Sequence, residues 1–393
     1  MRVVYILSST NVFGGASKAI VSLLKGFVAK GVEPIVVLPG TDGLYEELQR
    51  IGMCVIYAPM RLSVYPRHST LKGCLLFVPR LLYWRLLNVY SYIKLSKLLK
   101  KEHVDLIHTN VSVMDIGYRL AKRLHVPHVF HIREYADKDF NLHYFPSKKH
   151  FYEIFTCSNC FTICITKDVQ KHHGLDDVET SEVIYDGVCP LSALVLGKPK
   201  KSFFLYAGRI QPGKGLLSLV KSYLGYIKAV NWVDVVPLFV AGEACDVGYY
   251  NEIKTFIEKK GIQKYISFLG PRNDLAYFMQ HALAIVIPSV FEGFGFCMTE
   301  AMFNGCLVIG HNTGGTKEQF DNGRQLSSEE IGLRYDTEED LTSCLVDVVS
   351  HAPSYYSHTI ETAAKVACQL YSIERCVENV FNLYKRILDE KTD

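Results

Sequence analysis

The chain has 393 residues, more than one hydrophobic core usually serves, so two domains are expected. Hydrophobic residues make up 49% of the chain and charged residues 21%, which excludes a disordered protein and indicates a soluble globular one. The net charge of +3 is close to neutral and gives no global reason to expect a nucleic-acid partner.

The first residues, "MRVVYILSST", contain only a short apolar run at residues 3–7. This run is too short for the core of a signal peptide and favours a first buried strand instead. No later stretch approaches the roughly 18 uncharged apolar residues that a membrane-spanning helix requires. The sequence therefore predicts a cytoplasmic protein, and its twelve cysteines are expected to be reduced and mostly buried thiols.

One group of cysteines needs separate consideration. The stretch "CSNCFTICIT" places Cys157 and Cys160 in a C-x-x-C spacing, with Cys164, His172 and His173 downstream. A zinc half-site or a redox pair would use such a spacing. No second C-x-x-C or H-x-x-x-H completes a tetrahedral site, so a β-strand lined with small apolar side chains is the favoured interpretation, and no metal is predicted.

Short apolar runs typical of buried strands alternate with helical patterns along the whole chain. In the first half the runs are residues 3–7, 33–38, 54–58, 104–109, 128–132 and 160–165. In the second half they are "SFFLYAG", "VPLFVAG", "ISFLG", "AIVIPS" and "CLVIGH". Strands alternating with helices predict parallel sheets built from βαβ units.

Two such series predict two Rossmann-like, doubly wound domains. We expect them at residues 1–190 and 200–372, joined by a linker near 187–202, where Gly, Pro and Lys interrupt the pattern. The final helix, 373–393, could pack back on the first domain. Ligands of parallel sheets bind at the carboxyl ends of the strands, so the glycine-rich loops there deserve a search. These loops contain Gly14 and Gly15, residues 208–215, and residues 293–295.

The stretch "YAGRIQPGKGLLSLV" (206–220) resembles a phosphate-binding P-loop. Gly208, four further residues, Gly213 and Lys214 give the G-x-x-x-x-G-K part of that motif. The next residue should be Ser or Thr, whose hydroxyl holds a magnesium ion. Gly215 stands there instead, so a magnesium-dependent P-loop is not predicted.

The stretch "EGFGFCMTEAM" separates Glu292 from Glu300 by seven residues, with two glycines between them. Gly293 and Gly295 allow backbone amides to approach a ligand closely, and the helix that follows presents free N–H groups to an anion. We expect Glu300 in the first turn of this helix, where its carboxylate can accept hydrogen bonds from sugar hydroxyls. Glu292 is expected at the entrance of the loop.

"EGFGFCMTEAM" resembles the E-x7-E signature of the retaining glycosyltransferases of family 4, which adopt the GT-B fold with two domains facing a central cleft. "AGRIQPGKG" resembles the G-R-x-x-x-x-K-G donor-phosphate element of that family, and "FGGASKAI" its N-terminal glycine-rich loop. "VFHIREY" resembles the strand end that carries its active-site histidine. "VIYDGV" resembles an interdomain segment in which Asp186 replaces the usual asparagine, and no role is transferred to it.

The resemblance implies that Arg209 and Lys214 bind the diphosphate of a UDP- or GDP-linked sugar and stabilise the charge that develops on the leaving group. No metal is then needed, and Gly215 is no defect. The resemblance also implies that His131 contacts the donor sugar and shapes the acceptor pocket. The remaining residues implied for donor binding are Gly14, Gly15, Glu292, Gly293, Phe294, Gly295, Phe296 and Glu300.

A segment without acidic residues marks the acceptor side. Residues 48–101 contain ten Lys or Arg and no Asp or Glu, and residues 74–101 add many Leu and aromatic side chains. A basic amphipathic segment of this kind suits the surface of an anionic membrane. A helix packed on the first sheet, with its cationic face in water, explains the pattern equally well.

The resemblance implies a retaining, metal-independent glycosyltransferase that needs no cofactor beyond its nucleotide-sugar donor. Its acceptor would be a sugar or lipid-linked glycan, and its setting bacterial surface polysaccharide or glycolipid synthesis at the inner face of the cell membrane. A nucleotide-sugar epimerase of similar fold and a non-catalytic nucleotide-sugar-binding subunit are the alternatives.

Overall fold

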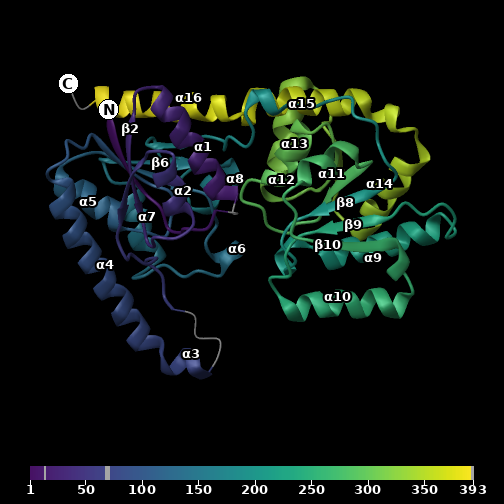
Figure 1. The fold of residues 1–393 in the computed structure, drawn as a ribbon, viewed down its shortest axis with the longest axis horizontal. Helices are drawn as coiled ribbons and strands as arrows, with labels where there is room; N and C mark the ends of the chain where they lie inside the picture. Colours follow the sequence, from purple (N-terminus) through teal and green to yellow (C-terminus); the bar gives the residue numbers. More distant parts are fainter. Residues whose placement is uncertain (13–14, 67–70, 391–393) are drawn as a thin grey trace. The chain divides into compact units, whose positions relative to one another are not determined.

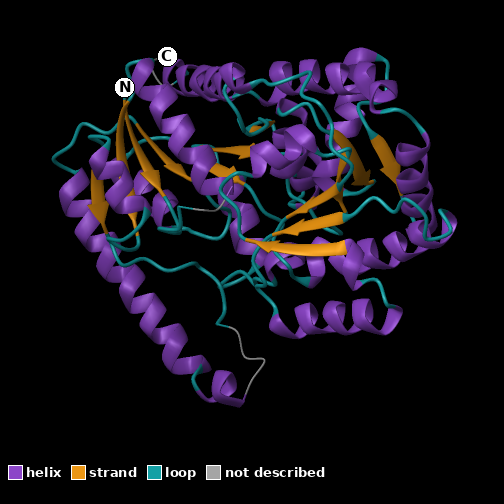
Figure 2. Ribbon diagram, turned by 45° about the vertical axis from the view of Figure 1, so that its right-hand side comes forward, coloured by secondary structure: helices purple, strands orange, loops and turns teal. Residues whose placement is uncertain are grey.

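The structure, a computed structural model, describes residues 1–12, 15–66 and 71–390 (Figure 1). The chain forms two compact units. The first consists of Met1–Gly187 together with Ile373–Asp393, and the second of Val188–Ser372. Each unit contains one parallel sheet with helices on its faces (Figure 2), as the alternation of strands and helices predicts.

The first unit contains a seven-stranded parallel sheet in the order β3-β2-β1-β4-β5-β6-β7. Its strands are β1 (Arg2–Ile6), β2 (Glu33–Leu38), β3 (Cys54–Tyr57), β4 (Leu106–Thr109), β5 (His128–Ile132), β6 (Cys160–Cys164) and β7 (Ser181–Val183). Its helices are α1 (Gly15–Ala29), α2 (Leu44–Arg50), α3 (Leu71–Leu75), α4 (Phe77–Leu99), α5 (Ile116–Leu124), α6 (Asp137–Phe140), α7 (Lys148–Phe155), α8 (Lys167–His172) and α16 (Ile373–Asp389).

Both faces of this sheet are buried, which explains why its strands are continuous apolar runs. Val3 and Tyr5 of β1 belong to a cluster with α1, α2 and α16. Val4 and Ile6, on the opposite face, pack with α4 and α5. Successive side chains of one strand therefore enter different cores, so a shift of one residue would exchange the two sets.

The second unit contains a six-stranded parallel sheet in the order β10-β9-β8-β11-β12-β13. Its strands are β8 (Phe204–Ala207), β9 (Leu238–Ala241), β10 (Ile266–Gly270), β11 (Ala284–Ile287), β12 (Leu307–His311) and β13 (Leu333–Tyr335). Its helices are α9 (Leu216–Ala229), α10 (Val247–Lys260), α11 (Leu275–His281), α12 (Phe296–Phe303), α13 (Gly314–Ser327), α14 (Glu338–Ser350) and α15 (Ser357–Tyr371). Four short 3-10 helices are η1 (Leu191–Ala193), η2 (Pro212–Lys214), η3 (Gln263–Tyr265) and η4 (Pro353–Tyr356).

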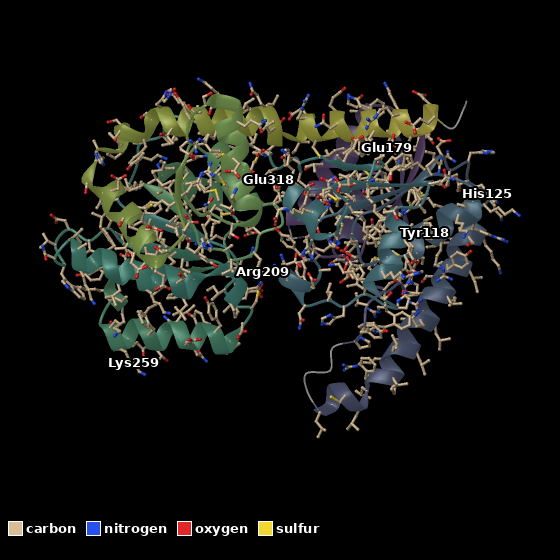
Figure 3. The ribbon with its side chains drawn as sticks, turned by 180° about the vertical axis from the view of Figure 1, so that it is seen from behind. Tyr118, His125, Glu179, Arg209, Lys259 and Glu318 are labelled. Atoms are coloured by element: carbon tan, nitrogen blue, oxygen red, sulfur yellow. The ribbon has the colours of Figure 1, made fainter. Side chains whose placement is uncertain are left out.

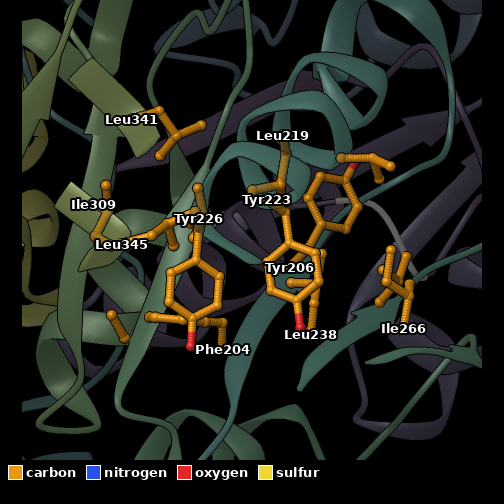
Figure 4. Close-up of a cluster of buried hydrophobic side chains, with 14 of the residues drawn as sticks. Phe204, Tyr206, Leu219, Tyr223, Tyr226, Leu238, Ile266, Ile309, Leu341 and Leu345 are labelled. Carbon is orange, nitrogen blue, oxygen red and sulfur yellow. The ribbon is translucent and has the colours of Figure 1, made fainter. Parts of the chain in front are cut away.

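One face of this second sheet is covered by α9 and α14, and the buried side chains between them form a large cluster (Figure 4). Phe204 and Tyr206 of β8 lie in it beside Tyr223 and Tyr226 of α9. The buried Tyr223 hydroxyl donates to the Val236 carbonyl over 2.7 Å, and the Tyr226 hydroxyl accepts from the Val236 amide over 3.0 Å. These bonds satisfy the polar ends of two aromatic rings inside an apolar core.

The eleven strands expected from apolar runs are present, and two strands are additional. β7 and β13 have three residues each and are only partly buried, so neither produces the apolar run that reveals a strand. "CFTICI" forms β6, as the structural interpretation of the cysteines predicts. All twelve cysteines are free thiols. No group of His, Cys, Asp and Glu suited to a metal ion occurs within residues 1–12, 15–66 and 71–390.

The last helix, α16, is part of the first unit, although the second unit precedes it in the chain. It packs on α1, where a side chain at Gly26 would collide with Val377. Its Tyr384 hydroxyl lies 2.6 Å from Nδ1 of the buried His108, and Glu378 pairs with Lys30 over 2.5 Å.

The helix α4 extends beyond the rest of the first unit, with α3 at its far end (Figure 1). Its buried positions are Asn88, Ser91, Leu95 and Leu99. Its solvent-exposed side is apolar. The exposed large apolar residues of α3 and α4, which we call the α4 ridge, are Leu71, Leu75, Val78, Leu82, Tyr83, Leu86, Val89, Tyr90, Ile93 and Leu98. Cations such as Arg80 and Lys97 are exposed on α4 as well, so both interpretations of this segment stay predictions. In the described residues no helix is both long and apolar enough to cross a membrane.

Candidate nucleotide-sugar site and acceptor-side cavity

In the second unit the strand order reverses between β8 and β11, and the predicted donor residues follow these two neighbouring strands. Arg209 comes directly after β8 and is exposed (Figure 3), and Lys214 ends η2 before α9. Glu292 follows β11 and lies in the loop before α12. Ligands of doubly wound sheets bind at this kind of reversal, so the predicted residues gather where the topology favours a site.

Lys214 and Glu292 are in direct contact, since the lysine Nζ donates to Glu292 Oε1 over 2.5 Å. The Ser289 hydroxyl donates to the same oxygen over 2.9 Å. Both charged side chains are partly buried, with 20% of Lys214 and 16% of Glu292 exposed. Lys214 of the "PGKG" turn therefore forms an ion pair with Glu292, the first glutamate of the E-x7-E stretch, although 78 residues separate the two in the chain.

Gly215 is required by backbone geometry. Its φ of +68° lies in the left-handed region, and a Cβ there would collide with the carbonyl of Pro288, just after β11. The turn after β8 thus packs on the end of β11, and neither Ser nor Thr could occupy this position without strain. The same packing brings Lys214 to Glu292.

Hydrogen bonds from the Gln319 side chain of α13 fix the loop between Glu292 and α12. Gln319 Nε2 donates to the carbonyls of Phe294 and Gly295 over 2.6 and 3.1 Å, and Gln319 Oε1 accepts from the Thr299 hydroxyl. Gly295 has a φ of +93° and precedes the first residue of α12, Phe296. These contacts turn the N-terminus of an eight-residue helix toward the end of the sheet, which favours an anion there.

Glu300 does not lie where the sequence placed it. Since α12 begins at Phe296, Glu300 is its fifth residue and belongs to the second turn, and the first turn contains no acidic residue. The prediction of a first-turn position was wrong because the helix begins directly after Gly295, at Phe296, so that four of its residues precede Glu300. Glu300 still lies near Glu292. Burial raises the pKa of the Cys297 thiol, and the charges of Glu300 and Glu292 raise it further.

Two side chains of this site were not singled out from the sequence. The Cys297 thiol donates to the Ala207 carbonyl over 3.4 Å and ties α12 to β8. The Tyr206 hydroxyl donates to the Arg209 carbonyl over 3.0 Å. Burial raises the pKa of Tyr206, and the charges of Glu292 and Arg209 act on it in opposite directions. Tyr206 is the third residue of β8, and its position next to the strand end was the available signal.

The predicted residues of the first unit are distributed differently. Gly15 is the first residue of α1, and Gly14 lies outside the described residues. His131 is the fourth residue of β5 and is fully buried within the sheet. Burial lowers the pKa of His131 well below its usual value, and the nearby Arg133 lowers it further, so its imidazole is neutral.

Arg133 connects His131 to the end of the sheet. Its Nη2 lies 3.3 Å from His131 Nδ1, its Nε donates to Asn110 Oδ1 over 2.9 Å, and its Nη1 pairs with Asp186. Asp186, for which no role was predicted, is thus the buried counter-charge of Arg133. Burial raises the pKa of Asp186, and the guanidinium opposes this rise.

Arg133 and Glu134 directly follow β5, and both line a cavity of about 330 Å³ in this unit. Glu134 was missed in the sequence. The rule that ligands bind after strand ends would have pointed to it, because "HVFHI" is followed directly by "RE".

Comparison with known proteins identifies the family. Residues 195–337 match the family described as "Glycosyl transferases group 1", and residues 13–190 match "Glycosyltransferase Family 4". An uncharacterised glycosyltransferase of Methanocaldococcus jannaschii is 24% identical over 309 residues, which are 77% of this chain and 81% of that protein. The UDP-Gal:alpha-D-GlcNAc-diphosphoundecaprenol alpha-1,3-galactosyltransferase of Escherichia coli is 30% identical over 264 residues, 60% of this chain and 65% of that protein.

The fold is also shared with solved structures. The Anabaena protein HepE in complex with UDP superposes with a TM-score of 0.76 at 17% identity, over 98% of this chain and 100% of that one. WaaG, a glycosyltransferase involved in lipopolysaccharide biosynthesis, superposes with a TM-score of 0.65 at 16% identity, over 97% and 99% of the two chains. The sequence matches in both halves and the shared fold agree: the chain belongs to the family 4 glycosyltransferases and has the GT-B fold.

Proposed function

We propose that this glycosyltransferase moves a sugar from a UDP- or GDP-linked donor to a hydroxyl acceptor, with retention of anomeric configuration and without a metal ion. The observation that carries the proposal is the contact between Lys214 and Glu292 at the reversal of the second sheet, near the end of β8 that Arg209 follows. HepE, which has the same fold, was solved with UDP and with UDP-glucose, which supports a nucleotide-sugar donor.

Arg209 and Lys214 supply two cations for the donor diphosphate, and the N-terminus of α12 adds its dipole. As the glycosidic bond breaks, negative charge builds on the leaving diphosphate, and fixed positive groups stabilise that charge. The acceptor would attack the same face that the diphosphate leaves, through an oxocarbenium-like state, and a phosphate oxygen of the donor would take its proton. Glu292 then binds and orients the donor while holding Lys214 in place.

The acceptor proposed is a sugar or a lipid-linked glycan of a surface polysaccharide or glycolipid pathway. The E. coli relative acts on a diphosphoundecaprenol-linked sugar, and another relative is an O-antigen chain mannosyltransferase, also of E. coli. Such acceptors lie at a membrane, so we propose that the enzyme works at the cytoplasmic face of the cell membrane. The α4 ridge, flanked by exposed cations such as Arg80 and Lys97, is the surface proposed for that contact.

The proposal is tested in two steps with the full-length enzyme. A thermal-shift screen of UDP, GDP and ADP sugars identifies the donor, because a bound ligand raises the melting temperature. The donor is then incubated with and without alkyl glycosides and with EDTA, and the products are analysed by NMR. Retention and full activity in EDTA are expected. Inversion, or abolition by EDTA with rescue by manganese, would contradict the proposal. Interconversion of donors without acceptor would identify an epimerase, and binding without turnover a non-catalytic subunit.

A further inference from the structure

The cavity in the first unit lies where the order of its sheet reverses, between β1 and β4. Three neighbouring strands contribute residues that follow their carboxyl ends within two positions: Ser8 after β1, Asn110 after β4 and Glu134 after β5. This is the place at which a doubly wound sheet binds a ligand. Its volume of about 330 Å³ is at the small end of the usual range for ligand sites.

Most walls of this cavity are apolar. Leu7, Ile20, Leu44, Leu62, Phe140 and Leu142 contribute to them. Few polar groups remain, which is typical of a site that surrounds an apolar ligand and fixes its orientation through a small number of hydrogen bonds.

Arg133 does not make the cavity cationic. Its guanidinium is directed to Asn110, His131 and Asp186, and the carboxylate of Asp186 neutralises its charge. The ligand that suits this cavity is therefore not an anion.

Glu134 is the acidic side chain of the cavity and is 6% exposed. Its Oε1 accepts from the amide and the hydroxyl of Ser112, both over 2.7 Å, and its Oε2 accepts from the Arg133 amide over 3.2 Å. A carboxylate can accept about four hydrogen bonds. The three bonds made by the described residues fix its position and leave capacity on Oε2 for a donor in the cavity.

We propose that the cavity binds an amphiphilic acceptor, with the apolar group attached to the sugar lying among the leucines and a hydroxyl of that sugar donating to Glu134. This inference rests on the proposed function and narrows its acceptor to glycosides that carry an apolar group directly on the sugar. Glu134 is then a residue that determines acceptor specificity.

The surroundings of Glu134 give the proposal a pH signature. Burial raises the pKa of Glu134 to about 7, and Asp139 of α6 adds to the rise, while the hydrogen bonds from Ser112 and Arg133 oppose it. Tyr144 shares the Ser112 hydroxyl, and His173 at the end of α8, whose pKa burial lowers to about 4, contacts the Glu134 carbonyl as a neutral ring. Because the ionised carboxylate is the stronger acceptor, affinity for a hydroxyl ligand rises as pH rises through 7.

The test measures binding of n-hexyl glucoside, galactoside and mannoside to the full-length enzyme by saturation-transfer NMR, with the free sugars as comparison. At least one hexyl glycoside is expected to bind about tenfold or more tightly than its free sugar, because the hexyl group is removed from water. Glu134→Gln should weaken this binding about fivefold or more and remove its increase between pH 6 and 8. Glu179→Gln, the same change at an exposed position, should leave it unchanged.

Two further variants keep the result interpretable. Leu142→Trp places a larger side chain in a partly exposed wall of the cavity and should block hexyl-glycoside binding. This variant tests the cavity independently if Glu134→Gln lowers the melting temperature. Leu82→Gln on the α4 ridge should leave hexyl-glycoside binding unchanged. Binding that is equal for hexyl glycosides and free sugars, or that is lost in Leu82→Gln but kept in Glu134→Gln, overturns the proposal.

UDP and GDP binding is measured in the same samples. Nucleotide binding without hexyl-glycoside binding refutes this inference alone, and failure to bind any nucleotide refutes the proposed function.

Discussion

Lys214 and Glu292 are in contact, so the proposed binding of the diphosphate by Lys214 and the proposed orientation of the donor by Glu292 depend on each other. Replacing either Arg209 or Lys214 by Ala removes a stabilising charge, so turnover is expected to fall at least about tenfold. Steady-state kinetics measure the effect, and Lys201→Ala, which removes a cation of the same unit next to Tyr277, serves as the control. Unchanged turnover in both site variants would exclude these cations from the diphosphate.

Substitutions of Glu300 and Glu292 are expected to have different effects on nucleotide binding. If Glu300 accepts hydrogen bonds from the ribose hydroxyls, Glu300→Gln weakens binding of the bare nucleotide by about 1–3 kcal/mol, the contribution of a hydrogen bond to a charged group. Glu292→Gln should reduce transfer more than nucleotide affinity, because Glu292 acts through Lys214 and the donor sugar. Calorimetry that shows normal nucleotide binding in the Glu300 variant would refute this division.

Buried histidines make the first unit sensitive to acid. Burial lowers the pKa of His128 to about 3 and that of His173 to about 4, and it lowers the pKa values of His108 and His131 well below normal. Unfolding restores ordinary values near 6.5, so the unfolded chain binds more protons below that pH. The stability due to neutral burial is present above about pH 6.5 and is lost as pH falls. The raised pKa values of Glu134, Asp139 and Asp186 oppose this trend.

The first unit is therefore expected to lose about 1.4 kcal/mol of stability per pH unit for each net proton taken up on unfolding. Hydrogen exchange at pH 7.5 and pH 6 should show faster global opening of residues 1–187 at the lower pH. No buried histidine occurs among the described residues of the second unit, so its exchange should change less once the intrinsic rate is corrected. Equal responses of the two units would contradict the prediction.

At the scale of elements, α4 differs from a normal surface helix because its apolar side is exposed and its buried side contains Asn88 and Ser91. Arg85 stacks 4.6 Å above the Phe145 ring, and Lys94 donates to the Tyr57 carbonyl over 2.7 Å, so neither is a fully available surface cation. The exposed cations attract an anionic surface, but the apolar ridge is what would enter it.

The enzyme is accordingly expected to float with anionic liposomes and to be released only partly by high salt, because salt screens charges and not apolar burial. Leu82→Gln with Leu86→Gln should reduce flotation at every salt concentration, whereas Arg80→Gln with Lys97→Gln should reduce it mainly at low salt. Nucleotide binding, measured alongside, should stay normal in both double variants because Arg209, Lys214 and Glu300 lie in the second unit. If the wild type does not float at low salt, α4 is a solvated helix that does not contact the membrane.

At the scale of the whole molecule, α16 completes a core that is otherwise formed by residues 1–187. Its buried side chains are Cys376, Val377, Val380, Leu383, Tyr384 and Ile387. Each large apolar side chain contributes about 1.5–3 kcal/mol when buried, and their sum approaches the total stability of a typical domain. A chain that ends at residue 372 should therefore lose the first unit and keep the second.

Limited proteolysis followed by mass spectrometry checks this expectation, since peptides of residues 1–187 should be cut rapidly while those of 188–372 stay protected. Lys30→Ala is a suitable control because it breaks an exposed ion pair with α16, whose loss should cost little stability. A truncated chain with a normally protected first unit would show that α16 is dispensable.

From the sequence alone the fold class, the positions of the main strands along the chain and the residues of the proposed donor site could be predicted. Strands buried on both faces are continuous apolar runs, and the glycine, lysine and glutamate stretches are local patterns that need no partner to be recognised. The same local nature explains the errors. Glu300 was placed one turn too early because the first helical residue depends on how Gln319 holds the loop, and β7 and β13 were missed because three partly buried residues make no pattern.

Only the tertiary structure decided which distant residues meet. Lys214 reaches Glu292 because β8 and β11 are neighbours, Asp186 neutralises Arg133 inside the first unit, and Glu134 rather than His131 lines a cavity. Whether the apolar residues of α4 face the core or the solvent also depends on what packs beside the helix, since amphipathicity does not specify a partner. Contacts between segments far apart in the chain are set by sheet order and close packing, which no local stretch of sequence encodes by itself.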